Sequence, residues 1–153
     1  RTGRKPVCDR NAFLLFASIL RDADIVDNCF NLYGPSWWER IRNNGFRGFD
    51  IEKTHISDSL FEAFEKSFNG KDETDNLRLL AETFNSYRAK TLGDAMLCLL
   101  SSPARLSFEI SKKMVIESDL HSRVSETLSN DEKTRQAYLF LKKSLGFKDI
   151  PDI

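Results

Sequence analysis

The spacing of the apolar residues constrains the fold of this chain most, because they recur every three or four positions along nearly its whole length. One such series is Leu60, Phe61, Phe64 and Phe68, and the next is Leu77, Leu80, Phe84 and Tyr87. This spacing places apolar side chains on one face of an α-helix, whereas a half-buried strand would alternate apolar and polar residues. No segment shows convincing alternation. The sequence therefore predicts an all-α fold of about seven or eight helices.

Capping residues and glycines predict where several of these helices begin and end. The stretches SWWE (36–39) and SNDE (129–132) have the form of a capping box, which satisfies free backbone N–H groups at a helix start. Gly70 and Gly146 are placed to end helices. The stretch RDAD (21–24) predicts a bend in the first helix, and KDETDN (71–76) predicts a charged loop and the cap of the helix that follows. Two further helices are expected over 105–116 and 118–128.

The composition fits one helical domain with short tails. The chain has twelve Phe but only seven Gly and four Pro, and 41% of its residues are hydrophobic, which is enough for a packed core. We expect the domain to span 9–147, between a basic tail or linker over 1–8 and a tail over 148–153. No apolar run approaches the roughly 20 residues of a membrane span. Basic and acidic residues both total 23, so only a local patch would favour nucleic acid.

Cysteine and histidine residues do not indicate a metal or cofactor site. Cys29 and Cys98 lie among apolar residues and are expected to be reduced core thiols, while Cys8 lies in the basic tail. His55 and His121 are far apart, and no Cys or His lies at zinc-ligand spacing around them. We therefore expect no metal and no cofactor. Because the first residue is Arg1 rather than Met, we expect the chain to be a domain excised from a longer protein.

The stretch TLGDAMLCLL (91–100) places Gly93 and Asp94 in the middle of an apolar helical face. A carboxylate on such a face needs partners, because an isolated buried charge is strongly unfavourable. Two interpretations are open. Asp94 could cap the start of a helix through the backbone N–H groups two or three residues further on. Alternatively, it could belong to a metal site or to the remains of one.

Three segments resemble ribonuclease III domains and follow one another in the same order. The stretch KTLGDAMLCLL (90–100) resembles the family's signature helix, E-R-L-E-F-L-G-D-A-V-L. Upstream, SLFEAFEKSF (59–68) resembles L-x-x-A-L-T-H-x-S-Y, and downstream KMVIESDL (113–120) resembles A-L-V-S-N-E-T-L. The resemblance covers about 60–128 and implies a ribonuclease III-like helical domain. The N-terminal segment 9–45 resembles no motif of the family.

The resemblance also implies that catalysis has been lost. Active members hold two Mg²⁺ ions with four carboxylates, and the ions activate water and stabilise the leaving group. Carried over residue by residue, the two signature positions are Lys90 and Asp94, and the two later positions are Lys133 and Gln136 in KTRQA. A lysine within about 4 Å would repel a divalent cation, and Lys90 could bond to Asp94 instead. The resemblance therefore predicts a pseudo-nuclease without metal.

Ribonuclease III domains generally pair through their signature helices, so the resemblance implies a dimer. The corresponding interface comprises Thr91, Leu92, Ala95, Met96 and Leu99. Family members often have an aromatic residue where this chain has Thr91, so we expect a heterodimer with another ribonuclease III family protein, and a homodimer stays open as the alternative. Lys112 and Lys113 are candidate contacts for double-stranded RNA.

Degenerate ribonuclease III-like domains occur in two mitochondrial settings. One is the multiprotein RNA-editing complexes of kinetoplastids, and the other is the large subunit of mitochondrial ribosomes. The resemblance favours a mitochondrial editing protein that dimerises, supports RNA binding or complex assembly, and contacts no membrane. A structural protein of the ribosomal large subunit is the alternative.

Two other interpretations stay open. An all-helical protein-interaction module unrelated to ribonuclease III would use Trp37 and Trp38 in its contact surface. An active nuclease would instead take its carboxylates from DETD (72–75) and from Glu82.

Overall fold

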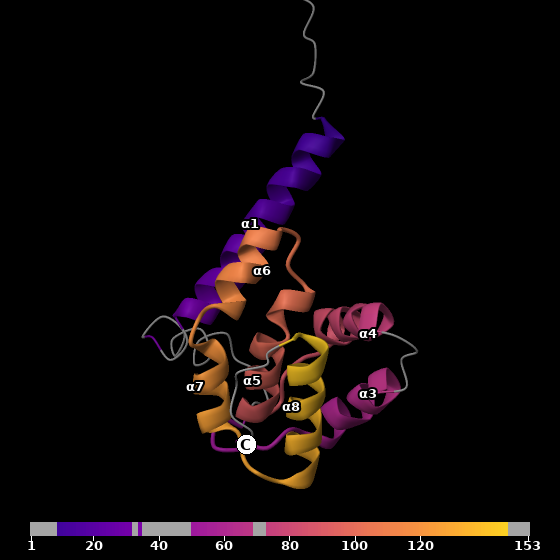
Figure 1. The fold of residues 1–153 in the computed structure, drawn as a ribbon, viewed down its shortest axis with the longest axis vertical. Coiled ribbons are helices and arrows are strands. Elements are labelled where there is room, and N and C mark those ends of the chain that lie inside the picture. Colours follow the sequence, from indigo (N-terminus) through magenta and orange to yellow (C-terminus); the bar gives the residue numbers. More distant parts are fainter. Residues whose placement is uncertain (1–8, 32–33, 35–49, 69–72, 147–153) are drawn as a thin grey trace, which may run out of the picture.

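The computed structural model describes residues 9–31, 34, 50–68 and 73–146, and these are mostly helical (Figure 1). They form α1 (Arg10–Phe30), α3 (Asp58–Phe68), α4 (Glu73–Ser86), α5 (Leu92–Leu100), the 3₁₀ helix η1 (Ser102–Ala104), α6 (Glu109–Ile116), α7 (Leu120–Thr127) and α8 (Glu132–Ser144). Within these ranges there is no strand, and Asp50 and Thr91 form an isolated bridge. The predicted all-α fold of seven or eight helices is confirmed.

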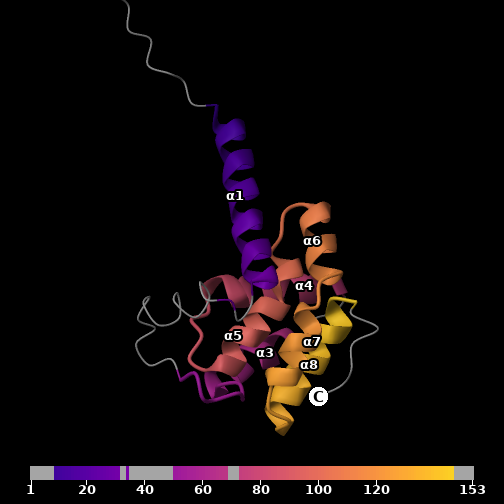
Figure 2. The same cartoon turned by 90° about the vertical axis from the view of Figure 1, so that its left-hand side faces the viewer.

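The short helix α5 lies at the centre of the domain, where α7 and α8 pack against it (Figures 1 and 2). Six of its nine residues are buried: Leu92, Gly93, Asp94, Met96, Leu97 and Leu100. The neighbouring helices complete the core with Leu60, Phe64, Leu80, Phe84, Val124, Tyr138 and Leu141. Each large apolar side chain removed from water contributes about 2 kcal/mol. Burial of both faces therefore holds α5 in its central position, although the helix is only nine residues long.

The long helix α1 is continuous, and its N-terminal half extends beyond the rest of the domain (Figures 1 and 2). The predicted bend at 21–24 is therefore wrong. The carboxylate of Asp22 accepts hydrogen bonds from the backbone N–H groups of Ser107 and Phe108, at 2.9–3.0 Å. Because this side chain is engaged by another segment, it does not compete for the backbone of its own helix.

Helix α4 begins at Glu73, within the stretch 71–76 that was predicted to hold a charged loop and the helix cap. One helix begins later than predicted. Helix α6 begins at Glu109 rather than near Arg105, because η1 occupies the residues just before Arg105, with Pro103 in its first turn.

The start of α8 is capped by Asp131, not by Ser129 as the capping-box pattern predicts. The Asp131 carboxylate accepts the backbone N–H of Thr134 at 3.1 Å, while the Ser129 hydroxyl donates to the Asp131 carboxylate at 2.5 Å. Two residues beyond the end of α8, Gly146 has a φ of 73°. This left-handed backbone confirms the predicted glycine stop.

Some predictions concern residues outside the described ranges. They are the helix opened at 36–39 with Trp37 and Trp38, the glycine stop at 70, Cys8, and the tails over 1–8 and 148–153. In the described part of the chain, no helix is both long and apolar enough to cross a membrane. Cys29 and Cys98 are free thiols, as predicted.

Candidate functional site

The candidate site is built around the N-terminus of α5, where Thr91 caps the helix. Thr91 is extended, with φ −128° and ψ 163°, and its hydroxyl accepts the backbone N–H of Asp94 at 3.0 Å. In return, the Asp94 carboxylate accepts the backbone N–H of Thr91 at 3.3 Å. This reciprocal pair is a capping box. The proposed cap at Asp94 is therefore wrong, because Asp94 is the third residue of the helix and Thr91 is its N-cap.

The segment 50–57 runs across this helix start and is joined to it by backbone hydrogen bonds. The Asp50 N–H donates to the Lys90 carbonyl at 2.8 Å, and the Leu92 N–H donates to the Asp50 carbonyl at 3.1 Å. The Gly93 N–H then donates to the Lys53 carbonyl at 3.2 Å. Two of these donors lie in the first turn of α5, where N–H groups have no partner within the helix. The crossing segment supplies those partners.

Gly93 allows this crossing because it has no side chain. A Cβ at this position would lie 2.5 Å from the His55 carbonyl oxygen and 2.6 Å from the Thr54 carbonyl oxygen. Both neighbours are backbone atoms that are held in place by other bonds: the Thr91 hydroxyl donates to His55, and the Ser129 N–H donates to Thr54. The glycine in the signature-like stretch is therefore required by the close approach of a second segment.

Asp94 is fully buried, with 0% of its surface exposed. Its Oδ1 accepts the Ser57 N–H at 2.8 Å. Its Oδ2 accepts from the Ser57 hydroxyl at 2.8 Å, the Tyr87 hydroxyl at 3.0 Å, and the N–H groups of Lys90 and Thr91 at 2.9 and 3.3 Å. Hydrogen bonds to a carboxylate are stronger than those between neutral groups. Burial of this charge is thus compensated by five donors from three segments, and none of the five is a cation.

Lys90 contacts Asp94 through its backbone, and its ammonium group is directed elsewhere. Its Nζ donates to the Ser59 hydroxyl at 2.9 Å, and Ser59 also lies 3.1 Å from the Tyr87 hydroxyl. Burial is the main cause that raises the pKa of Tyr87. The Tyr87 hydroxyl therefore keeps its proton, which it donates to Asp94. The predicted bond between Lys90 and Asp94 exists, but its donor is the peptide N–H.

Lys133 and Gln136 lie on α8, near the other end of the crossing segment. Lys133 Nζ lies 2.6 Å from Asp58 Oδ1, and this ion pair lowers the pKa of Asp58. Gln136 donates its amide to Glu132, one turn earlier on its own helix, at 3.2 Å. Between them, buried Thr134 accepts the Ile56 N–H at 3.0 Å. The structure therefore places the start of α8 beside segment 50–57, but it directs neither Lys133 nor Gln136 to Asp94.

A polar pocket of about 300 Å³ opens beside this junction. It is lined by Asp50, Lys53, His55, Ile56, Ser57, Asp58, Lys90 and Thr91. Its two aspartates are each paired with a lysine, since Lys53 Nζ lies 3.1 Å from Asp50, and Asp58 is paired with Lys133. The hydrogen bond from Lys53 lowers the pKa of Asp50. No group of three or more His, Cys, Asp or Glu side chains suited to a metal ion occurs among the described residues.

The predicted dimer-interface residues divide into two groups. Thr91, Leu92 and Met96 are buried in the chain's own core, so they offer no surface to a partner. Ala95 and Leu99 are partly exposed on α5. The crossing segment and the core cover these three residues. An interface on this helix stays a prediction that depends on Ala95 and Leu99.

The other candidate residues form local ion pairs. On α6, Lys112 pairs with Glu109 at 2.5 Å and Lys113 pairs with Glu117 at 3.7 Å. On α4, both Asp75 and Glu82 pair with Arg78, at 3.8 and 2.9 Å. Of the residues proposed for RNA contact and for an alternative carboxylate cluster, these four each have an opposite charge as a neighbour. Asp72 lies outside the described residues.

Segment 50–57 is the part of the site that sequence reasoning missed. It has no helical periodicity, and its bonds to α5 join residues about 37 positions apart. The only local signal is the glycine at position 93, which indicates a close approach but does not identify the segment that approaches.

No family model, no curated protein and no solved structure matches the chain.

Proposed function

We propose that this chain is a non-catalytic, ribonuclease III-like domain that pairs with a ribonuclease III family subunit. In this role it supports double-stranded RNA binding or complex assembly in mitochondrial RNA editing. The observation that carries the proposal is the state of Asp94. Both oxygens of this carboxylate are already engaged by five hydrogen-bond donors in a fully buried position.

Such a carboxylate is poorly suited to metal chemistry. Mg²⁺ requires oxygen ligands in near-octahedral geometry and usually retains several waters. Binding at Asp94 would displace donors from Ser57 and Tyr87 and leave them unsatisfied in the core, at about 1–3 kcal/mol for each buried group. The ammonium group of Lys90, which donates to Ser59 beside Tyr87, would add repulsion. These costs support a structural role for Asp94.

A cleavage assay tests the loss of catalysis. The chain is incubated with double-stranded RNA and Mg²⁺ or Mn²⁺, with an active ribonuclease III as the positive control. We expect no cleavage and no Mg²⁺-dependent shift in the melting temperature. Cleavage that disappears in the Asp94→Asn variant would show that the domain is an active nuclease.

A pairing assay tests the role of α5. The chain is mixed with a ribonuclease III family subunit from the same source, and complex formation is followed by sedimentation. We expect Leu99→Glu on α5 to weaken the complex, and Leu14→Glu on the distant end of α1 to leave it unchanged. Absence of a complex with the unaltered chain would contradict the proposal. If cell imaging locates the full-length protein outside mitochondria, the editing role is excluded.

One observation favours a second candidate function, that of an all-helical protein-interaction module. Large apolar side chains are exposed on α1 and α6, among them Phe13 and Phe16, each 60% exposed, and Ile110, which is 71% exposed. Exposed apolar clusters of this kind mark contact surfaces on proteins. The family subunit used above would then fail to bind, while another protein would cover α1. A structural protein of the mitochondrial ribosomal large subunit would also need a partner that covers α1, and that partner would be a ribosomal component.

A further inference from the structure

Helix α1 carries an apolar stripe that its own domain leaves largely exposed, with only Val26 packed in part against the core. The stripe consists of Ala12, Phe16, Ile19, Ala23, Val26 and Phe30, and we call it the α1 seam. Its members are separated by four, three, four, three and four residues. This alternation is the a/d pattern of a coiled coil, in which each side chain enters a gap on a facing helix. The pattern is shorter than three heptads, and it favours a helix as its partner.

The domain itself binds α1 through a different face. The buried residues of α1 are Asp22 and Cys29, which lie one heptad apart and outside the seam. Asp22 accepts the backbone N–H groups of Ser107 and Phe108, and the Cys29 thiol lies 3.6 Å from the Ser102 hydroxyl. By contrast, Phe16 is 60% exposed and Ile19 is 48% exposed. The seam is thus free along the projecting half of the helix.

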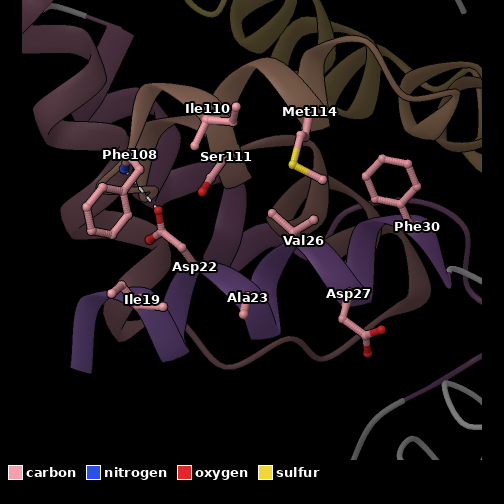
Figure 3. A pocket seen from close by; sticks show the side chains of 10 residues that line it. All are labelled: Ile19, Asp22, Ala23, Val26, Asp27, Phe30, Phe108, Ile110, Ser111 and Met114. Carbon is pink, nitrogen blue, oxygen red and sulfur yellow. Dashed lines mark hydrogen bonds between the residues drawn. The ribbon is translucent and has the colours of Figure 1, made fainter. Parts of the chain in front are cut away.

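Along its second half, the seam forms one wall of a largely apolar pocket of about 710 Å³ (Figure 3). The seam contributes Ile19, Ala23, Val26 and Phe30, and the opposite wall contains Ile110 and Met114, one turn apart on α6. Figure 3 shows Met114 directed from α6 toward Val26. The molecule therefore has a projecting apolar arm, which is the N-terminal half of α1, and an apolar groove, which is this pocket beside the C-terminal half of α1.

We propose that two copies of this chain pair through antiparallel α1 helices, each placing its projecting arm in the groove of the other. In an antiparallel coiled coil, a positions face d positions. With a two-fold axis near residue 21, Ala12 faces Phe30, Phe16 faces Val26, and Ile19 faces Ala23 of the other copy. In each layer a larger side chain meets a smaller one. Such alternation fills a helix interface at native density.

This self-complementarity is the reason for choosing a second copy as the occupant. A parallel pair would oppose Phe16 to Phe16 and Ala23 to Ala23, producing overpacked and empty layers in turn. A two-fold interface also requires each surface to match itself. The seam meets that requirement with no charged member. Two carboxylates line the groove: Asp22 accepts the backbone N–H groups of Ser107 and Phe108, and Asp27 accepts a hydrogen bond from Asn31.

The available apolar area matches that of a stable pair. The exposed side chains on and beside the seam and on α6 are Phe13, Leu15, Phe16, Ile19, Leu20, Phe30, Ile110 and Met114. Each is roughly half exposed or more, which amounts to on the order of 700 Å² per copy. Two copies would bury about 1,400 Å², and stable interfaces bury roughly 1,200–2,000 Å². The surface is therefore large enough without a contribution from α5.

The first test is the mass of the full chain in solution, measured by light scattering over a range of micromolar concentrations. We expect a dimer, twice the 17.6 kDa of one chain. Phe16→Glu places a charge inside the interface and should raise the dissociation constant about 100-fold or more. Leu14→Glu is the matched control, because Leu14 is 51% exposed on the opposite side of the same helix and should leave the dimer intact.

The second test examines the register. Ala23→Ile should weaken the dimer by placing two large residues in one layer, and adding Ile19→Ala to the same chain should restore it. A monomeric unaltered chain, or equal weakening by Phe16→Glu and Leu14→Glu, would overturn the proposal. If the Phe16→Glu variant is still a dimer, the interface lies on another face, such as α5, and the proposal is overturned. Circular dichroism of each variant establishes that the fold is intact, and the outcome is independent of the nuclease assay.

Discussion

Gly93 and His55 are in direct backbone contact, close enough that a Cβ on Gly93 would lie 2.5 Å from the His55 carbonyl oxygen. The contact joins the first turn of the central helix α5 to segment 50–57. It explains a glycine within a buried apolar helix, where glycine otherwise costs about 1 kcal/mol relative to alanine. Glycine is required despite this cost, because a side chain at position 93 would keep segment 50–57 from reaching Asp94.

Gly93→Ala should therefore destabilise the fold strongly. Because the obstructing atoms belong to the backbone at 54–55, relief would require separating the segment from α5, and we expect a loss of about 3 kcal/mol. Urea unfolding followed by circular dichroism measures this loss. Gly146→Ala is the comparison: its φ of 73° is unfavourable for alanine but nothing lies within 4 Å, so about 1 kcal/mol is expected. Equal losses would contradict the packing role of Gly93.

Asp94→Asn should also destabilise the domain, for a polar reason. An amide keeps one oxygen but introduces an N–H₂ group that faces donors whichever way the side chain is turned, and we expect a loss of about 2–4 kcal/mol. Tyr87→Phe removes one of the five hydrogen bonds and should cost about 1 kcal/mol. Both values come from the same unfolding measurement, made with and without Mg²⁺. A stability that rises with Mg²⁺ only when Asp94 is present would indicate a metal ligand.

Helical periodicity was sufficient to predict the fold class and most helices, because one buried face repeats along each of them. It could not predict the site in detail. Thr91, Gly93 and Asp94 lie within four positions, and several capping arrangements are compatible with that order. The choice of Thr91 as cap depends on segment 50–57, whose carbonyls accept the N–H of Gly93 and the hydroxyl of Thr91. Such contacts are distant in sequence and leave no local pattern.

The buried role of Asp22 was missed for a similar reason, although a partial signal existed. Asp22 precedes Ile25 and Cys29 by three and seven positions, so it lies on the face of α1 that packs on the domain. The acidic residues at 22 and 24 suggested a polar bend instead. Asp22 is buried because it accepts the two free backbone N–H groups before α6, those of Ser107 and Phe108. No pattern in residues 10–30 reveals these donors.

Asp22→Asn should weaken the attachment of α1 to the domain. The carboxylate of Asp22 accepts the N–H groups at the start of α6, where a negative charge is favourable, so we expect a loss of about 1–3 kcal/mol. Hydrogen exchange of α1 amides should increase together with this loss. Asp27→Asn, on the exposed side of the same helix, should change stability by less than about 0.5 kcal/mol. Similar effects of both substitutions would refute the capping role.

The thiols of Cys29, which is buried, and of Cys98, which is partly buried, should be chemically inert in the folded protein. Burial raises the pKa of Cys98 to about 12 and also raises the pKa of Cys29. At pH 8 the thiolate fraction of Cys98 is then on the order of 10⁻⁴, so alkylation should be about 1,000-fold slower than for an ordinary cysteine. Mass spectrometry of a Cys8→Ser variant, treated with iodoacetamide with and without urea, measures this ratio. Rapid native labelling of Cys98 would exclude burial of its sulfur.

The N-cap of α8 should contribute an acid-sensitive part of the stability. Burial of Asp131 acts to raise its pKa, but hydrogen bonds from Ser129 and Thr134 outweigh this effect and lower the pKa below its usual 3.8. A carboxylate with a lowered folded-state pKa stabilises the fold above its unfolded pKa, and this contribution disappears as the pH falls through the folded value. Asp131→Asn keeps a capping oxygen that does not titrate. Unfolding free energies from pH 7 to pH 2.5 should show the unaltered chain more stable by about 0.5–1 kcal/mol at neutral pH. The difference should begin to decrease near pH 4 and disappear as the pH falls through the folded-state pKa of Asp131. A difference that is independent of pH would mean that the charge of Asp131 has no part in capping α8.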